Sequence, residues 1–169
     1  MNNIQRSDPS QIPGAGREAK ETHSAPAQGD TLTWRQTPVH TVDFNLSPYT
    51  VIWEITRACD LSCVHCRATA QKMRDPGELS ATEGYHLIDD IADFGSPVFV
   101  ITGGDPLKRP DLEDLIRYAA KERRLRTSLT PSATPLVTRL RLQEIRNSGI
   151  SRIALSLDGP GAAMHDTFR

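Results

Sequence analysis

The sequence predicts an α/β fold built around a parallel sheet, and two observations carry this prediction. Four short apolar segments of the kind that form buried strands recur after residue 50. Three stretches with apolar residues at helical spacing lie between them. Strands that alternate with helices are typical of βαβ units, in which neighbouring strands run parallel.

The strand candidates differ in texture. Residues 97–102 form a continuous apolar run, as expected of a strand covered on both faces. The last candidate alternates, so that Ile153, Leu155 and Leu157 should face the helices while Ala154, Ser156 and Asp158 face the interior. The four predicted strands are 51–55, 97–102, 126–130 and 152–157.

Each predicted helix has a start or stop signal. Ser80 and Glu83 form a capping box ahead of the first helix, and Gly95 ends it. Pro110 is expected to open the second helix in its first turn, and Gly149 to end the third. The apolar residues expected to face the core are Leu87, Ile88, Ile91 and Phe94, then Leu112, Leu115, Ile116 and Ala119, then Val137, Leu140 and Ile145.

Residues 1–47 have a different composition. They are rich in Gln, Ser, Pro, Gly and Thr and show almost no apolar periodicity, which predicts a poorly ordered N-terminal arm. Trp34 and Phe44 are the residues through which this arm would dock, if it docks. Residues 48–169 are therefore expected to form the core.

The loop after the first strand carries every cysteine of the chain, in the pattern Cys-x-x-x-Cys-x-x-Cys at Cys59, Cys63 and Cys66. Three thiolates at this spacing suit three corners of a [4Fe–4S] cluster, which leaves one iron open to substrate. A structural zinc site that adds His65, a disulfide that leaves one thiol over, and reduced structural thiols are the alternatives.

Two further groups of residues follow strand candidates. Gly103 and Gly104, followed by Asp105 and Pro106, stand at the end of the second strand, where glycines let a ligand approach the backbone closely. A tight strand-to-helix turn closed by the proline is the alternative. At the end of the fourth strand, Ser156 and Asp158 need polar partners. A polar ligand would supply them, and a water-satisfied Asp-Gly turn is the alternative.

Composition narrows the compartment and the partners. The net charge is −1, from 20 basic and 21 acidic residues, so there is no electrostatic case for nucleic acid or an anionic membrane. No apolar run approaches the ~20 residues that span a bilayer, and the N-terminus lacks the apolar core of a signal peptide. The expected compartment is the cytoplasm, where thiols stay reduced.

The three motifs, in this order on three strand ends, closely resemble the radical S-adenosylmethionine (SAM) superfamily over about residues 48–169. Cys-Val-His-Cys and Thr-Gly-Gly-Asp-Pro-Leu look nearest to the branch of alternative haem-synthesis enzymes and peptide-modifying maturases. The resemblance implies a partial (β/α) TIM-like barrel that holds a [4Fe–4S] cluster on Cys59, Cys63 and Cys66. It also implies SAM as cosubstrate, an external one-electron reductant, and a 5′-deoxyadenosyl radical that takes hydrogen from a tetrapyrrole or a peptide.

The resemblance also assigns roles to the other motif residues. The segment Gly103–Pro106 should contact the SAM amino group chiefly through its backbone, with Asp105 where the family usually has Glu. His65 fills the position that touches adenine, and Ser156, with Asp158 nearby, matches a position that meets the ribose or the methionine carboxylate. Arg57 and Arg67 flank the cysteine loop and either tune a cluster's charge or are solvated, whereas Asp60 is expected to be solvated.

Four strands cannot close a barrel, so the chain is expected to be the N-terminal part of a longer enzyme or a truncated product. On its own it is expected to bind a cluster poorly and to turn over SAM weakly or not at all. A non-catalytic zinc or iron–sulfur module and an inactive remnant are the rival functions.

Overall fold

The computed structural model of the chain describes residues 43–169. The predicted arm therefore lies largely outside the described residues, and Trp34 with it. Residues 43–47 form a turn in which the backbone N–H groups of Leu46 and Ser47 donate to the carbonyl of Asp43. Phe44 is exposed in this turn.

Four parallel strands form a single sheet in the order β1-β2-β3-β4. They are β1 (Thr50–Glu54), β2 (Val98–Thr102), β3 (Arg126–Leu129) and β4 (Arg152–Ile153). The register pairs Trp53 with Ile101 and Ile101 with Leu129. Because all four strands run the same way, their carboxyl ends share one edge of the sheet. The predicted α/β alternation is confirmed.

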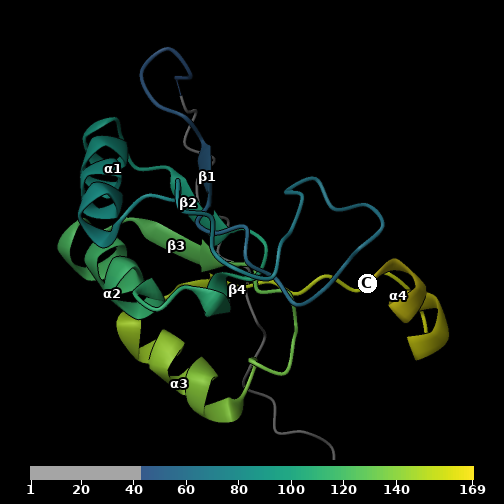
Figure 1. Ribbon diagram of the computed structural model, residues 1–169. Coiled ribbons are helices and arrows are strands. Elements are labelled where there is room, and N and C mark those ends of the chain that lie inside the picture. Colours follow the sequence, from purple (N-terminus) through teal and green to yellow (C-terminus); the bar gives the residue numbers. More distant parts are fainter. Residues whose placement is uncertain (1–42) are drawn as a thin grey trace, which may run out of the picture. The chain divides into compact units, whose positions relative to one another are not determined.

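Three helices connect the strands, and Figure 1 shows them side by side along one face of the sheet. They are α1 (Ala81–Asp93), α2 (Leu112–Arg117) and α3 (Arg139–Ser148). The capping box of Ser80 and Glu83 is present at the start of α1, and Gly95 and Gly149 adopt positive φ angles just beyond α1 and α3. These helix signals are confirmed.

Three further elements were not predicted. A 3-10 turn, η1 (Pro106–Lys108), follows the Gly-Gly segment, and a π-helical turn, η2 (Tyr118–Glu122), continues α2. A short helix, α4 (Ala162–Phe168), stands apart from the helix layer in Figure 1. Within residues 43–169 no helix has the length and apolar character that crossing a bilayer requires.

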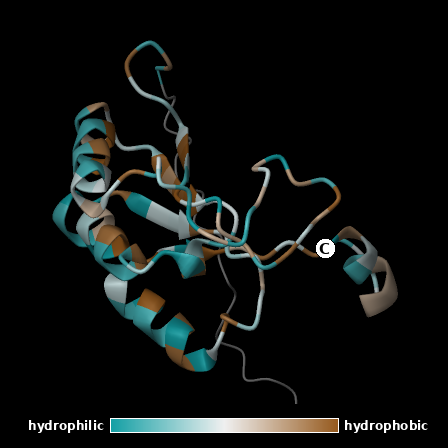
Figure 2. Ribbon diagram, in the orientation of Figure 1, coloured by the Kyte–Doolittle hydropathy of each residue, from teal (hydrophilic) through white to brown (hydrophobic). Residues whose placement is uncertain are grey.

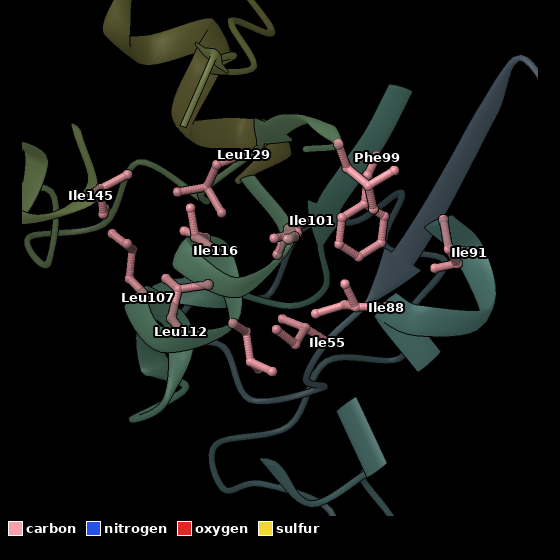
Figure 3. Packing of buried hydrophobic residues seen from close by; sticks show 13 residues of the cluster. Ile55, Ile88, Ile91, Phe99, Ile101, Leu107, Leu112, Ile116, Leu129 and Ile145 are labelled. Carbon is pink, nitrogen blue, oxygen red and sulfur yellow. The ribbon is translucent and has the colours of Figure 1, made fainter. Parts of the chain in front are cut away.

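The core lies between the sheet and the helix layer. Figure 3 shows Phe99 and Ile101 of β2 pointing toward Ile88 of α1 and toward the side chains of α2. Both β2 side chains are fully buried, and burial of each stabilises the fold by roughly 1.5–3 kcal/mol. In Figure 2 hydrophobic colour follows β2, whereas β3 is mostly neutral or hydrophilic.

Several sequence expectations fail at the edges of this core. Leu155 and Leu157 are 54% and 82% exposed, because β4 ends at Ile153 and β3 offers no partner beyond Leu129. Leu140 and Phe94 are also mostly exposed, since α3 turns chiefly Ile145 to the core and Phe94 lies at the C-cap of α1. Pro110 precedes the N-cap of α2, Asp111, and so lies outside that helix.

One buried cation ties the sheet to the start of the helix layer. Arg109 has no exposed side-chain surface, and it donates to the carbonyls of Ile55 and Leu79, both at 2.9 Å. It also forms a bidentate pair with Asp111 at 2.9 and 3.0 Å and lies over the ring of Trp53. A buried guanidinium is tolerated only when its donors are used in this way. Arg109 thus holds together the two ends of the cysteine loop.

Candidate functional site

A pocket of about 440 Å³ opens at the carboxyl ends of the strands. This is the edge of a parallel sheet where α/β folds place their ligands. The three predicted motifs meet here, although they are far apart in the sequence. The lining residues from those motifs are Cys59, Cys63, His65, Cys66, Gly103, Gly104 and Ser156.

The cysteine loop enters the pocket from the end of β1. Cys59 is buried, Cys63 is half-buried and Cys66 is exposed, and all three are free thiols. A turn closes between Cys63 and Cys66, where the N–H of Cys66 donates to the carbonyl of Cys63 at 3.1 Å. The N–H of Leu61 donates to Cys59 Sγ at 3.4 Å.

The donor set fits an iron–sulfur cluster with three protein ligands. Thiolate sulfur is the ligand that such clusters take, and a backbone N–H aimed at a ligating sulfur is one of the features that tune them. In the described part of the chain, no three His, Cys, Asp or Glu side chains are gathered closely enough to hold a metal ion. The three thiols therefore share a pocket, but in this structure they do not converge on one point.

The Gly-Gly turn lies directly against the first residues of the cysteine loop. Gly103 has φ +147°, and a Cβ there would stand 2.4 Å from the carbonyl oxygen of Thr56. A Cβ on Gly104 would stand 2.6 Å from the oxygen of Ala58. In place of side chains there are two backbone hydrogen bonds of 2.7 Å, from Gly104 N to Thr56 O and from Asp105 N to Ala58 O.

Asp105 and Pro106 are buried behind this turn and do not line the pocket. One carboxylate oxygen of Asp105 accepts from the N–H of Leu107 at 3.1 Å and so caps η1. The other accepts from Thr134 Oγ1 at 2.6 Å. The side chain of Asp105 thus stabilises the turn, and the pocket sees the two glycines.

The far wall of the pocket is made by the chain after β4. Ser156 lines it, whereas Asp158 does not and instead pairs with Arg169 at 3.4 Å. The ring of His65 lies 5.9 Å from that of Phe168, and the N–H of Val64 donates to the carbonyl of Phe168 at 3.1 Å. The segment that contains α4 is thereby fastened to the cysteine loop.

Five polar residues of the lining were given no role by the sequence reasoning: Glu54, Thr102, Thr130, Ser132 and Arg169. Ser132 lies between two motifs, because its hydroxyl donates to the carbonyl of Gly104 and also contacts Cys59 Sγ at 3.6 Å. Thr130 and Ser132 follow the third strand, so the strand-end argument that selected the other motifs applies to them as well. Glu54 is the single carboxylate of the lining, beside the cations Arg67 and Arg169.

Two of the charged residues that flank the cysteines, Arg57 and Asp60, have definite partners. Arg57 pairs with Asp75 at 3.3 Å and donates to the carbonyls of Ala68 and Thr69, so it organises the loop. Asp60, which was expected to be solvated, pairs with Lys108 of η1. This pairing places a further contact between the cysteine loop and the segment that follows the Gly-Gly turn.

Comparison with known protein families identifies the family to which the chain belongs. The family model described as the radical SAM superfamily matches residues 53–169. The chain belongs to the radical SAM superfamily. The resemblance seen in the three sequence motifs is confirmed, and the superfamily implies SAM and an iron–sulfur cluster as its cofactors.

Relatives of this radical SAM chain include haem-synthesis enzymes and peptide maturases, as the sequence predicts. An AdoMet-dependent heme synthase of Oleidesulfovibrio alaskensis is 47% identical over 119 residues, which are 70% of this chain and 30% of that protein. A mycofactocin maturase of Mycobacterium tuberculosis is 33% identical over 126 residues, 73% of this chain and 31% of that protein. The chain spans about a third of the length of the curated relatives it matches.

A solved radical SAM structure supports the fold. SuiB of Streptococcus suis, in a crystal structure with bound SAM, superposes with a TM-score of 0.59 at 21% identity. The match covers 71% of this chain and 27% of that chain. The four-stranded sheet with its helices therefore corresponds to part of a radical SAM barrel, as the sequence predicts.

Proposed function

We propose that Cys59, Cys63 and Cys66 hold a [4Fe–4S] cluster and that the adjoining pocket binds SAM. The single observation that carries this proposal is the meeting of three distant motifs in one pocket at the carboxyl ends of parallel strands. Superfamily membership supports it independently. When bound and reduced, the cluster would supply the electron that cleaves SAM into methionine and a 5′-deoxyadenosyl radical.

In this proposal the chain's own residues bind and orient SAM. Gly103 and Gly104 line the pocket without side chains, so the amino group of SAM can approach the backbone of this turn closely. His65 offers its backbone and ring to the adenine, and Ser156 offers a hydroxyl to the ribose or the methionine carboxylate. Asp105, Pro106 and Asp158 act from behind the lining, because none of them reaches the pocket.

The proposed substrate is a tetrapyrrole, with a peptide as the second candidate. The 47% identity to a heme synthase, against 33% to a mycofactocin maturase, supports this order. An external one-electron reductant is required, since no residue of the chain can supply the electron. Free thiols and a reducible cluster favour the cytoplasm as the compartment.

Anaerobic reconstitution with iron and sulfide tests the proposal. The chain is expected to take up iron and sulfide in equal amounts, at low loading, and to gain a broad visible absorbance. Cys59→Ser, Cys63→Ser and Cys66→Ser should each lose most of it, because these are the only thiols in the chain. Ser62→Ala, an exposed change inside the same loop, is the matched control and should bind normally.

A second measurement separates the metal from the chemistry. After reduction with dithionite, SAM is added and 5′-deoxyadenosine is followed, with substrate left out. Uptake of zinc without visible absorbance would favour the rival reading of a structural metal module. A cluster that survives all three cysteine variants would overturn the ligand assignment.

A further inference from the structure

The loop that carries the cysteines is unusually long, and a carboxylate joins its two ends in addition to Arg109. The loop leaves β1 after Glu54 and returns to the chain just before α1, where Glu78 stands. The two ends of the loop are neighbours in space, because Thr56 and Arg57 bond to Glu78. The cysteines lie between these ends in the sequence. Glu78 belongs to none of the three sequence motifs.

The Glu78 carboxylate accepts four hydrogen bonds. Its Oε1 accepts from Thr56 Oγ1 and from the N–H of Arg57, both at 2.8 Å, and from the N–H of Asp75 at 3.2 Å. Its Oε2 accepts from Arg74 Nε at 2.8 Å. Its side chain is only 8% exposed. A carboxylate this deeply buried is stable only because these donors replace water.

These bonds continue directly to the first cysteine. Thr56 Oγ1, which donates to Glu78, also accepts from the N–H of Ala58 at 3.1 Å. Two backbone bonds then join this stretch to Gln71: Gln71 N donates to Arg57 O at 3.0 Å, and Cys59 N donates to Gln71 O at 2.8 Å. Glu78 therefore fixes the outgoing segment of the loop, at Thr56 and Arg57, and through it the returning segment at Gln71.

The same stretch forms the support for the Gly-Gly turn. Thr56 and Ala58 offer their carbonyls to the N–H groups of Gly104 and Asp105, at 2.7 Å each. Displacement of Thr56 would therefore move the glycines as well as Cys59. In the returning segment of the loop, Thr69 has φ +49°, an uncommon conformation for a β-branched residue, and Arg57 Nη2 donates to its carbonyl at 3.1 Å. Arg57 thus bonds to the returning segment at the residue with this uncommon backbone conformation.

We propose that Glu78 is the positioning residue of the cysteine loop, and that it sets the placement of Cys59 relative to the Gly103–Gly104 turn. The inference rests on the proposed function, because the value of a fixed loop lies in the cluster it would hold. Glu78 does not line the pocket that holds the cysteines, so it acts through Thr56 and Arg57. The buried Arg109 also joins the ends of the loop, but it does so at the carbonyls of Ile55 and Leu79.

The test uses the chain without a cluster, in anaerobic buffer with a reductant. Amide hydrogen exchange is measured at Ala58 and Cys59, and alkylation is timed at the buried Cys59 thiol. In Glu78→Gln one carboxylate oxygen becomes an NH2 group. If this group faces Arg74, the bond from Arg74 is lost; if it faces Thr56, Arg57 and Asp75, the bonds from those donors are lost. Both rates should rise about tenfold or more, as expected for losing one hydrogen bond to a charged group. Glu122→Gln, an exposed change of the same chemistry, should leave them unchanged.

A second pair of variants tests the route of the effect. Thr56→Ser keeps the hydroxyl between Glu78 and the Ala58 N–H, whereas Thr56→Val removes it and keeps the shape. We expect Thr56→Val to match Glu78→Gln and Thr56→Ser to stay near the original rates. Exchange at Ile101 and Leu129, in the middle of the sheet, reports whether the whole fold has loosened.

Each outcome decides the matter. Unchanged exchange and alkylation rates in Glu78→Gln would overturn the proposal. Sheet amides that exchange faster together with the loop in Glu78→Gln and Thr56→Val would also overturn it, because Glu78 would then be a general stabilising residue. Reconstitution is then compared: Glu78→Gln should retain several-fold less iron and sulfide than the original chain and Glu122→Gln. Equal retention would overturn the link to cluster binding. If the original chain itself takes up no cluster, the proposed function fails while the exchange result stands.

Discussion

Substitution of Gly104 by alanine should damage the junction between the cysteine loop and the Gly-Gly turn. The added Cβ would stand 2.6 Å from the oxygen of Ala58 and 2.7 Å from that of Arg57. Both neighbours are backbone atoms, which cannot swing aside as a side chain does. The turn must therefore move away from the loop.

The cost follows from the contacts that this movement breaks. The hydrogen bonds from Gly104 N to Thr56 O and from Asp105 N to Ala58 O are both 2.7 Å long, and each contributes about 1 kcal/mol. Forcing a group into a packed site costs a further ~1–3 kcal/mol. The free energy of unfolding should fall by about 3–5 kcal/mol, a large fraction of the ~5–15 kcal/mol of a typical domain.

Thermal unfolding followed by near-ultraviolet circular dichroism measures this loss. The midpoint should drop by roughly 10 °C or more. Gly161→Ala is the matched control, because a Cβ at Gly161 meets no atom within 4 Å. A Gly104→Ala midpoint within about 2 °C of the control would refute the steric argument.

Three further predictions concern the surroundings of the site. Arg109→Met leaves Asp111 without its buried partner and should cost about 3–5 kcal/mol in calorimetric unfolding; a loss below about 1 kcal/mol would contradict the role given to this cation. Ser80→Ala removes the capping box with Glu83 and should cost about 1 kcal/mol by urea unfolding, with no change in the slope. Burial alone would raise the pKa of Glu78, but the hydrogen bonds from Arg74, Arg57, Thr56 and Asp75 outweigh it and lower the pKa below 4.5. The stability that Glu78 contributes should thus be present above pH 4.5 and be lost as the pH falls through the lowered pKa. Protection of the loop amides, relative to their intrinsic exchange rates, that is already lost near pH 6 would be inconsistent with this prediction.

The sequence was most informative where one local signal was sufficient. The capping box at Ser80, the apolar run of β2 and the helical spacing of Leu112, Leu115 and Ile116 all correspond to elements or buried positions in the structure. The three motifs were also expected at one edge of the sheet, because parallel strands end on the same side. Local pattern and topology together led to the pocket.

The sequence was less informative where burial depends on a neighbour. The alternation from Ile153 to Leu157 has the period of a strand, yet strand geometry needs a partner to bond to, and β3 ends at Leu129. Glu78 escaped notice for a related reason. A single Glu in a polar stretch carries no periodicity, and its importance comes from Thr56 and Arg57, which are far from it in the sequence.

Asp105 replaces the Glu that is usual in the family, and the turn that follows the two glycines is nevertheless closed by hydrogen bonds to its carboxylate. The resemblance implies a contact to SAM chiefly through the backbone of this segment, and Asp105, which stands where the family usually has Glu, is one methylene shorter. In this structure the carboxylate points away from the pocket, is fully buried, and bonds to Leu107 and Thr134. A capping carboxylate must reach an N–H only two residues ahead, and for this the short side chain of Asp is well suited. A Glu would add a methylene to a site with no exposed surface, where extra volume is itself destabilising. The side chain of Asp105 therefore stabilises the turn from behind, and Gly103 and Gly104 are the residues of this motif that line the pocket.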